Sequence, residues 1–333
     1  MRSVLLGGQG TCSIVETPTP VPGPGQVLVR TGVSALCGSE LATYRHAGMA
    51  SGNTGHEGMG RVEAVGDGVT TVKPGDRVGV SAIAGCGRPA CAACAAGQST
   101  WCPRFQFYGS MHAEYFIAGA TGCLPLPDDV PDDVGVLLSG DGLGVPYHTS
   151  RKLTDPDIGS VAVFGLGPVG LGNVLVQSRL GRTVLAVDLA PERLDLARKL
   201  GAAHTIDVRD GDPLPRILEL TGGRGADAAI EAAGLPLTAK QCFKAVRTAG
   251  TVVFNGEQPS VDLSPSDDFI RRDVRAIGSW FFHVGEFPDM LRWWRDGLPV
   301  AELVTHVIPL AQASEAFTAF AGGRTGKVLL RYG

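Results

Sequence analysis

Residues 160–170 read SVAVFGLGPVG and constrain the fold more than any other stretch of this chain. An apolar run of strand length ends directly in a glycine-rich turn, and helix-forming sequence follows it. From there to about residue 280, apolar segments alternate with helical segments such as PERLDLARKLG. The strand candidates are residues 161–164, 183–187, 204–208, 227–231, 251–255 and 274–280. This alternation predicts an α/β fold with a doubly wound parallel sheet, covered by helices on both faces.

The turn itself, GLGPVG, fits the pattern G-x-G-x-x-G. Its glycines allow a tight turn and let backbone N–H groups approach a pyrophosphate at the start of a helix. The next strand candidate, TVLAVD, ends in Asp188, eighteen residues after Gly170. A carboxylate there would accept hydrogen bonds from an adenosine ribose, although Asp188 could instead cap the next helix. The candidate cofactor-binding residues are Gly165, Leu166, Gly167, Pro168, Val169, Gly170 and Asp188.

The identity of residue 188 also bears on which dinucleotide binds. Asp188 would repel a 2′-phosphate, which favours NAD over NADP. Arg193 lies only five residues further on and acts against that preference.

The first 145 residues have a different texture, rich in Gly, Pro and β-branched residues. The runs QVLVRTGVSAL, GRVEAVG and DRVGVSAIAG have strand length and are broken by Pro-Gly turns. They predict short antiparallel strands in a barrel or sandwich. Because 333 residues are too many for one ordinary core, we expect two domains, with the change near residue 146.

Charge and hydropathy exclude several classes of partner. The net charge is −4 and the isoelectric point is near 6.0, so neither nucleic acid nor an anionic membrane is an expected partner. The sequence shows no secretory signal and no apolar run long enough to span a bilayer, so we expect a cytoplasmic protein. In a reducing compartment, clustered cysteines favour metal ligands or catalytic thiols over disulfides.

Half of the eight cysteines lie within seventeen residues, in CGRPACAACAAGQSTWC. Cys86, Cys91, Cys94 and Cys102 have the spacing C-x4-C-x2-C-x7-C. Four thiolates in one loop can close a tetrahedral shell around Zn²⁺ and leave no position for substrate, so this pattern predicts a structural zinc site. The alternative is an incidental group of buried thiols. A thioredoxin-like motif is disfavoured because the C-x-x-C pair lies outside the βαβ half.

A second set of candidate ligands is scattered along the chain. Cys37 lies in ALCGSEL, His56 and Glu57 in NTGHEGMG, and Asp141 in LLSGDGLG. Taken singly, each has an ordinary structural explanation, as a small core residue, a hydrogen-bonded histidine or a turn. Taken together, a thiol, an imidazole and a carboxylate form the mixed set of an open catalytic zinc site.

These motifs together resemble the zinc-dependent medium-chain alcohol dehydrogenase family over essentially the whole chain. GHEGMGRVEAVGDGV is similar to the family's zinc signature, and CGSE is similar to its Cys-Gly-Ser/Thr-Asp segment. The resemblance implies a GroES-like, β-rich catalytic domain at residues 1–145 and 283–333. A Rossmann NAD-binding domain at residues 146–282 would interrupt it. The family often forms dimers or tetramers, so a homo-oligomer is expected, and VRAIGSWFF is a candidate pairing strand.

The resemblance also assigns roles to individual residues. Cys37, His56 and Asp141 would hold a catalytic zinc ion, and Glu57 would approach the metal and exchange with bound water. The cysteine loop would hold a structural zinc ion. Arg193 and Lys327 would contact the adenosine and pyrophosphate of NAD.

Four features of the sequence depart from the family pattern. Glu40 replaces the usual Asp, and the cysteine loop begins C-x4-C rather than C-x2-C. Ala42 stands where a proton-relay histidine is common, with His46 near but out of register. Only eighteen residues separate Cys37 from His56, which shortens the loop beside the substrate entrance.

The activity that this resemblance implies is hydride transfer between NAD and an alcohol, giving a ketone or aldehyde. A substrate hydroxyl would occupy the open coordination position, and Ser39 would accept its proton. The carboxylate ligand and the CGSE segment favour a secondary hydroxyl in a polyol, a sugar-like molecule or a small alcohol. The aromatic residues that could line the pocket are Tyr44, Trp101, Phe105, Phe107, Tyr108, Trp280 and Phe281, although most of them are expected simply to pack in the core or in the cleft between the domains. Alternatives are a metal-free, NADPH-dependent quinone or enoyl reductase and a catalytically idle nucleotide-binding sensor.

Overall fold

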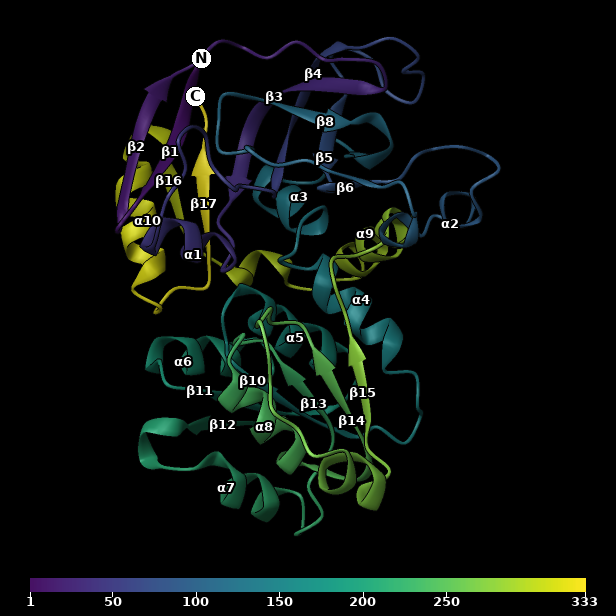
Figure 1. Ribbon diagram of the computed structural model, residues 1–333, viewed down its shortest axis with the longest axis vertical. Coiled ribbons are helices and arrows are strands. Elements are labelled where there is room, and N and C mark those ends of the chain that lie inside the picture. The colour runs from purple at the N-terminus through teal and green to yellow at the C-terminus, as the bar shows by residue number, and fades with distance from the viewer. The chain divides into compact units, whose positions relative to one another are not determined.

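The computed structural model describes residues 1–333, which form two compact units (Figure 1). One unit consists of residues 1–144 and 281–333, and the other of residues 145–280. The chain therefore leaves the first unit, builds the second and returns. No helix in the structure has both the length and the apolar character needed to cross a bilayer.

The second unit is built on a six-stranded parallel sheet in the order β12-β11-β10-β13-β14-β15. Its strands are β10 (Ser160–Phe164), β11 (Thr183–Asp188), β12 (His204–Asp207), β13 (Ala226–Glu231), β14 (Val246–Phe254) and β15 (Arg275–Gly278). The central strands β10 and β13 are buried almost without alternation, as expected when helices cover both faces. The predicted doubly wound sheet is confirmed, and all six strand candidates are strands. Strand β15 lies at the sheet edge.

Helices connect these strands. They are α5 (Pro168–Arg179), α6 (Pro191–Lys199), α7 (Pro213–Leu220) and α8 (Pro236–Ala245). Each begins at a proline, whose fixed φ angle suits the first helical turn and whose missing N–H costs nothing there. Helix α4 (Gly144–Lys152) lies at the junction where the chain enters this unit.

The first unit contains a seven-stranded sheet in the order β16-β17-β3-β4-β5-β9, with β8 also paired to β3. Two small two-stranded sheets, β1-β2 and β6-β7, accompany it. The strands are β1 (Arg2–Gly8), β2 (Thr11–Glu16), β3 (Gln26–Ala35), β4 (Gly58–Val65), β5 (Arg77–Val80), β6 (Ile83–Ala84), β7 (Gln106–Phe107), β8 (Tyr115–Gly119), β9 (Cys123–Pro125), β16 (Val304–Pro309) and β17 (Lys327–Arg331). The pairings among β3, β4, β5, β8 and β9 are antiparallel, as predicted for this half of the chain.

The returning segment completes this sheet. Strand β17 pairs antiparallel with β3, and β16 pairs parallel with β17. The helices of the unit are α1 (Glu40–Arg45), α2 (Ala92–Ala95), α3 (Asp132–Leu138), α9 (Phe287–Arg295) and α10 (Ala313–Ala321). Helix α10 lies beside β16 and β17 (Figure 1). Its phenylalanines pack into a core formed with β1 and β17. The last strand of the chain therefore lies beside the strand that leads to Cys37.

Candidate metal centres

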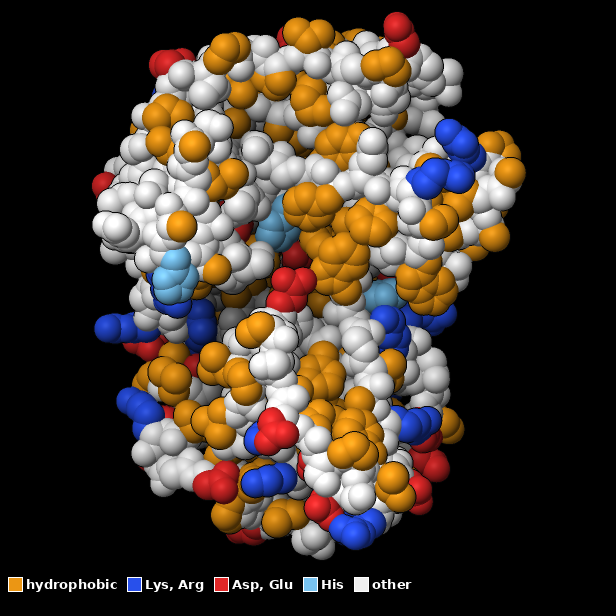
Figure 2. Space-filling model, viewed as in Figure 1, with side chains coloured by type: hydrophobic (Ala, Val, Ile, Leu, Met, Phe, Trp, Pro, Cys, Tyr) orange, Lys and Arg blue, Asp and Glu red, His pale blue; other side chains and the backbone are white.

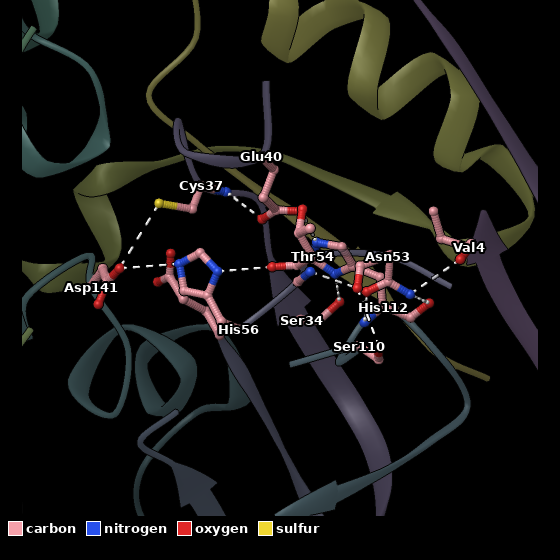
Figure 3. A network of polar contacts seen from close by, with 12 residues as sticks. Val4, Ser34, Cys37, Glu40, Asn53, Thr54, His56, Ser110, His112 and Asp141 are labelled. Carbon is pink, nitrogen blue, oxygen red and sulfur yellow. Dashed lines mark hydrogen bonds and ion pairs between the residues drawn. The ribbon is translucent and has the colours of Figure 1, made fainter. Parts of the chain in front are cut away.

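Four scattered ligand candidates meet in the first unit. The side-chain donor atoms of Cys37, His56, Glu57 and Asp141 all lie within 4.8 Å of one another, and all four residues are buried. The Asp141 Oδ2 atom lies 3.2 Å from His56 Nε2 and 3.9 Å from Cys37 Sγ (Figure 3). The Asp141 Oδ1 atom is buried with no hydrogen-bond partner. A buried carboxylate oxygen without a partner is costly, and a cation among these donors would satisfy it.

The ends of four elements bring these side chains together. Cys37 follows β3 by two residues, and His56 and Glu57 directly precede β4. Asp141 lies in the turn after α3, and Lys327 is the first residue of β17. Because β3 is the neighbour of both β4 and β17, the sheet itself fixes the three strand ends that carry Cys37, the His56–Glu57 pair and Lys327.

The orientation of the His56 ring suits a metal ligand. Its Nδ1 lies 2.9 Å from the Thr54 carbonyl oxygen, which can only accept, so Nδ1 donates. The Nε2 atom faces Asp141 Oδ2, to which it donates while the ring is protonated. Once that proton is lost, Nε2 is the free ligand atom, as in sites where a carbonyl sets the tautomer of a ligand histidine. A glycine is required nearby, because a Cβ at Gly140 would lie 2.6 Å from Glu57 Oε2.

The electrostatics of the cluster are set by acidic groups that are buried close together. Burial disfavours the His56 imidazolium, but Cys37 and Asp141 outweigh burial and hold the pKa of His56 well above its usual range. Burial raises the pKa of Glu57, and Asp141 adds to that effect, although Lys327 opposes it. Three acidic groups thus share one buried space, which a divalent cation would neutralise.

Lys327 forms a buried ion pair with Glu57. The Lys327 side chain is 1% exposed and that of Glu57 is fully buried. Burial disfavours the charged ammonium, but Glu57 outweighs it and raises the pKa of Lys327. The residue predicted to contact the pyrophosphate therefore holds the carboxylate beside the candidate ligands.

Ser39, the predicted proton acceptor, is exposed at the start of α1 and makes no hydrogen bond to that helix. Ala42 and His46, the residues at and near the relay position, are exposed as well. His46, the histidine nearest in sequence to the relay position, therefore lies at the surface.

Sequence reasoning missed the polar residues behind these ligands. Glu40 and His112 are both fully buried and form a pair, with His112 Nε2 2.8 Å from Glu40 Oε2 (Figure 3). Glu40 was noted only as a departure from the family's Asp, and His112 was not singled out. The one signal of this pair in the sequence is Glu40 itself. A glutamate is longer than the family's usual aspartate and can therefore reach a different partner.

The four clustered cysteines also converge. The sulfur atoms of Cys86, Cys91, Cys94 and Cys102 lie within 4.8 Å of one another, and no cysteine of the chain is in a disulfide. Cys86 Sγ lies 3.8 Å from Cys94 Sγ, and Cys91 Sγ lies 3.9 Å from Cys102 Sγ. Zinc bound tetrahedrally to thiolates at about 2.3 Å would place the sulfurs about 3.8 Å apart. The longer first spacing therefore still permits a closed four-sulfur shell.

Residues 86–102 are called the lobe below. The pKa values of two of its thiols are shifted in opposite directions. Hydrogen bonds from the Arg88 backbone and the Arg104 guanidinium lower the pKa of Cys86 to about 6. Burial raises the pKa of Cys94 to about 12. One sulfur is thus a thiolate at neutral pH before any metal binds.

The lobe is attached to the segment by which the chain returns to this unit. Thr100 Oγ1 lies 2.9 Å from His283 Nδ1, and the ring of Trp101 meets the His283 ring edge-on at 4.7 Å. The Gly285 N–H donates to the Gly97 carbonyl at 3.0 Å. A structured lobe therefore fixes the residues that directly follow Phe281.

Two aromatic rings flank His56. The rings of Phe107 and Phe281 lie 6.1 and 5.9 Å from the imidazole and 6.0 Å from each other. Phe281 adopts a left-handed conformation with φ of 51°, which is strained for a bulky residue. Figure 2 shows hydrophobic side chains gathered beside a histidine in the upper half of the view. The candidate metal centre thus has an apolar wall.

The other predicted pocket aromatics differ in their surroundings. Tyr44 is buried in the core against Phe317, with the ring centroids 5.5 Å apart, and Tyr108 packs against the β-sheet core. Trp101, Phe105 and Trp280 are exposed by 59%, 38% and 42%. The rings of Phe107 and Phe281 contact the candidate ligand His56.

The glycine-rich turn of the second unit has the backbone that its sequence predicts. Gly165 has φ of 86°, and a Cβ there would lie 2.7 Å from the Ala233 backbone. A Cβ at Gly170 would lie 1.9 Å from the Gly165 carbonyl oxygen. Helix α5 begins one residue after Gly167, so its first N–H groups point out of this turn.

Asp188 is bound to that turn. Its Oδ2 accepts the Leu166 N–H at 2.6 Å, and its Oδ1 accepts the N–H groups of Leu189 and Ala190 at 2.8 and 2.9 Å. Because a carboxylate has about four acceptor positions, one on Oδ2 is left for a ligand hydroxyl. Burial lowers the pKa of the nearby Arg193, although Asp188 opposes the shift.

Comparison with known proteins identifies the class of protein that this fold and these sites define. Residues 23–128 match the alcohol dehydrogenase GroES-like domain, and residues 168–296 match the zinc-binding dehydrogenase domain. The uncharacterized zinc-type alcohol dehydrogenase-like protein YphC of Escherichia coli K12 is 32% identical, over 100% of this chain and 99% of that protein. The chain belongs to the zinc-dependent medium-chain dehydrogenase/reductase family and is an oxidoreductase.

Two further relatives indicate the range of that family. Sorbitol dehydrogenase of Gallus gallus is 30% identical, over 99% of this chain and 96% of that protein. An alcohol dehydrogenase of Escherichia coli CFT073, solved in complex with the cofactor NADH, is 26% identical with a TM-score of 0.86. That alignment covers 99% of each chain.

Proposed function

We propose that this protein is a zinc-dependent dehydrogenase that transfers a hydride between NAD and a secondary hydroxyl of a polyol, a sugar-like molecule or a small alcohol. One observation carries the proposal: a thiol, an imidazole and two carboxylates meet in a buried space, with Asp141 Oδ1 left without a partner. The relatedness to a sorbitol dehydrogenase and to alcohol dehydrogenases supports it.

The open cluster fits zinc through Cys37, His56 and Asp141. Zinc at such a site supplies Lewis acidity, which lowers the pKa of a bound hydroxyl toward neutrality. Glu57 is within reach of the same space but is held by Lys327, so it is the exchangeable fourth donor. The four-cysteine lobe fits a second zinc ion with a structural role, because its donors are all sulfur and leave no open position.

The second unit is the proposed NAD-binding domain. The N–H groups at the start of α5 bind the pyrophosphate, and Asp188 accepts a ribose hydroxyl on its remaining Oδ2 lone pair. The same carboxylate repels a 2′-phosphate, so NAD is preferred to NADP even with Arg193 close by. The NADH complex of the related alcohol dehydrogenase supports this choice. NAD supplies the acceptor for the hydride.

Ser39 is the proposed first acceptor of the substrate proton. It lies two residues after Cys37 and is exposed, so the proton passes from it to solvent. Ala42 carries no group that could relay a proton, and exposed His46 is the nearest alternative.

The aromatic wall limits the shape of the substrate. Phe107 and Phe281 flank His56, so the substituent on that side of the carbinol carbon is apolar or a C–H face of a polyol. Such a wall excludes water from the reacting carbon.

A homo-oligomer is the proposed assembly. Strand β15 pairs only with β14, so its other edge is open to pairing with a strand of a second copy.

The function is tested by following NADH formation with a panel of secondary alcohols and polyols. We expect turnover with at least one of them, and little with the same substrates and NADP. Asp141→Ala should abolish turnover, whereas Asp227→Asn, which changes a buried carboxylate of the second unit, should not. Turnover of quinones or enones with NADPH, unaffected by Asp141→Ala, would instead identify a metal-free reductase.

A further inference from the structure

A buried polar network lies behind the open cluster and joins the two turns that carry Cys37 and His56 (Figure 3). On one side, Glu40 Oε1 accepts the backbone N–H of Cys37 at 2.9 Å, while Glu40 Oε2 lies 2.8 Å from His112 Nε2. Both side chains of this pair are 0% exposed. The carboxylate therefore connects the Cys37 turn directly to the imidazole.

On the other side, His112 is connected to the His56 turn. The Asn53 side chain accepts the His112 N–H at 3.1 Å and donates to the His112 carbonyl at 3.2 Å. Asn53 Oδ1 also accepts the N–H of Gly55 at 3.1 Å. A Cβ at Gly55 would lie 2.6 Å from His112 Cδ2, so the imidazole packs directly on the backbone that precedes His56.

The His112 ring is held at every edge. Its Nδ1 lies 2.8 Å from Ser34 Oγ, which in turn lies 2.9 Å from the Tyr332 hydroxyl. The ring of Phe317 meets it edge-on at 5.8 Å. Both carboxylate oxygens of Glu40 and both ring nitrogens of His112 thus have partners, which is the condition for a buried polar pair to fix a single geometry.

We propose that Glu40 and His112 are positioning residues, acting as one brace that sets the separation of Cys37 Sγ and His56 Nε2. Glu40 does not reach the His56 ring nitrogen, because Thr54 occupies His56 Nδ1. Its effect passes through His112 to Asn53 and Gly55. The length of Glu40 is essential, since an aspartate is one methylene shorter and cannot contact both the Cys37 N–H and His112.

This inference rests on the proposed metal site, so the test uses a metal readout that is independent of turnover. Cobalt(II) is titrated into each variant and into its Cys37→Ser counterpart, so that the difference spectrum reports the open cluster alone. Affinity is measured by competition with a chelator. The variants are Glu40→Asp, Glu40→Gln, His112→Phe and the double variant Glu40→Asp/His112→Phe, with Asp227→Asn as a matched buried-carboxylate control in the second unit.

We expect Glu40→Asp and His112→Phe each to weaken cobalt binding by about 10–100-fold and to broaden its absorption bands. The double variant should be no weaker than the single ones, because the two residues act as one unit. Glu40→Gln keeps the length and should lose about 10-fold or less. If Glu40→Asp prevents folding, Glu40→Gln and His112→Phe still test whether the pair sets the geometry of the metal site. Asp227→Asn should bind cobalt like the wild type.

The brace would be overturned if the Glu40 and His112 variants bound cobalt with the affinity and spectrum of the wild type and were only less stable to unfolding. Glu40 and His112 would then have a purely structural role. Additive losses in the double variant would also overturn it. If wild-type protein shows no difference spectrum against Cys37→Ser, the proposed metal site itself fails, and the brace with it.

Discussion

The two cysteine-containing clusters of this protein differ in how the chain assembles them. The lobe draws all four donors from one stretch of seventeen residues, and every donor is sulfur. The open cluster draws its donors from three separate places in the chain and mixes sulfur, nitrogen and oxygen. The closed set therefore depends on local spacing, whereas the open set depends on the pairing of β3 with β4 and on the packing of α3 against both strands.

The clusters also differ in their unsatisfied groups. In the open cluster a buried carboxylate oxygen, Asp141 Oδ1, has no partner. In the lobe the sulfurs face one another, and Cys86 and Cys94 are only partly buried. A catalytic zinc site keeps an open coordination position, and a structural zinc site does not.

The largest expected effect separates the two clusters by activity. Cys37→Ser should lower kcat/KM by about 10³-fold or more, because the metal's charge stabilisation is worth several kcal/mol in the transition state. Steady-state kinetics measure the loss, and thermal unfolding checks that the fold persists. Cys123→Ala, a buried thiol outside both clusters, is the control and should retain activity. Equal losses in both variants would show that Cys37 has no special role.

The second expected effect concerns the aromatic wall, which only the open cluster has. Phe107→Ala should lower kcat/KM for substrates with an apolar substituent by about 10–100-fold, because a lost hydrophobic contact costs about 1–3 kcal/mol. For the smallest secondary alcohol the loss should be much less. Phe105→Ala changes a neighbouring exposed ring and should leave the ratio of the two substrates unchanged. A uniform loss with all substrates would contradict a specificity role for Phe107.

The third expected effect is on stability rather than chemistry. Cys94→Ser should release the lobe's metal and lower the unfolding midpoint by on the order of 10 °C, since losing a metal is among the larger single-residue effects. Below that midpoint kcat/KM should fall less than in Cys37→Ser. Differential scanning calorimetry and kinetics at low temperature measure both. A complete loss of activity in a folded Cys94→Ser protein would break the division of roles.

The smallest expected effect is a pH-dependent reactivity inside the lobe. In metal-free protein Cys86, whose pKa is lowered to about 6, is a thiolate above about pH 6, whereas Cys94, whose pKa is raised to about 12, stays protonated. Iodoacetamide at pH 7 should therefore label Cys86 before Cys94, as read by peptide mass spectrometry. Zinc should protect both. Equal labelling of the two would contradict these pKa directions.

Much of the fold could be predicted from the sequence, because the patterns that indicate it are local. Strand, glycine turn and helix follow one another within residues 160–179, and the alternation beyond them predicts a parallel sheet. The lobe was equally readable, since its four thiols lie in one loop. The antiparallel half was predicted from its runs and turns, although not the parallel pairing of β16 with β17.

Contacts between distant residues were not readable in the same way. Nothing near His112 or Glu40 in the sequence indicates that they pair across 72 residues. The Glu57–Lys327 ion pair spans 270 residues and depends on β17 returning beside β3. Asp141 was joined to Cys37 and His56 only as part of a mixed ligand set, and its role as a ligand came from family resemblance, because an aspartate between glycines otherwise predicts a turn.

The central claim, one open and one closed metal centre, is tested most directly by counting zinc per chain. Elemental analysis of the wild type, Cys37→Ser and Cys94→Ser should give two, one and one zinc ions, each variant losing a different ion. Of the two variants, only Cys94→Ser should retain the zinc ion that chelators remove together with activity. One zinc ion in the wild type that Cys37→Ser leaves in place would contradict the account.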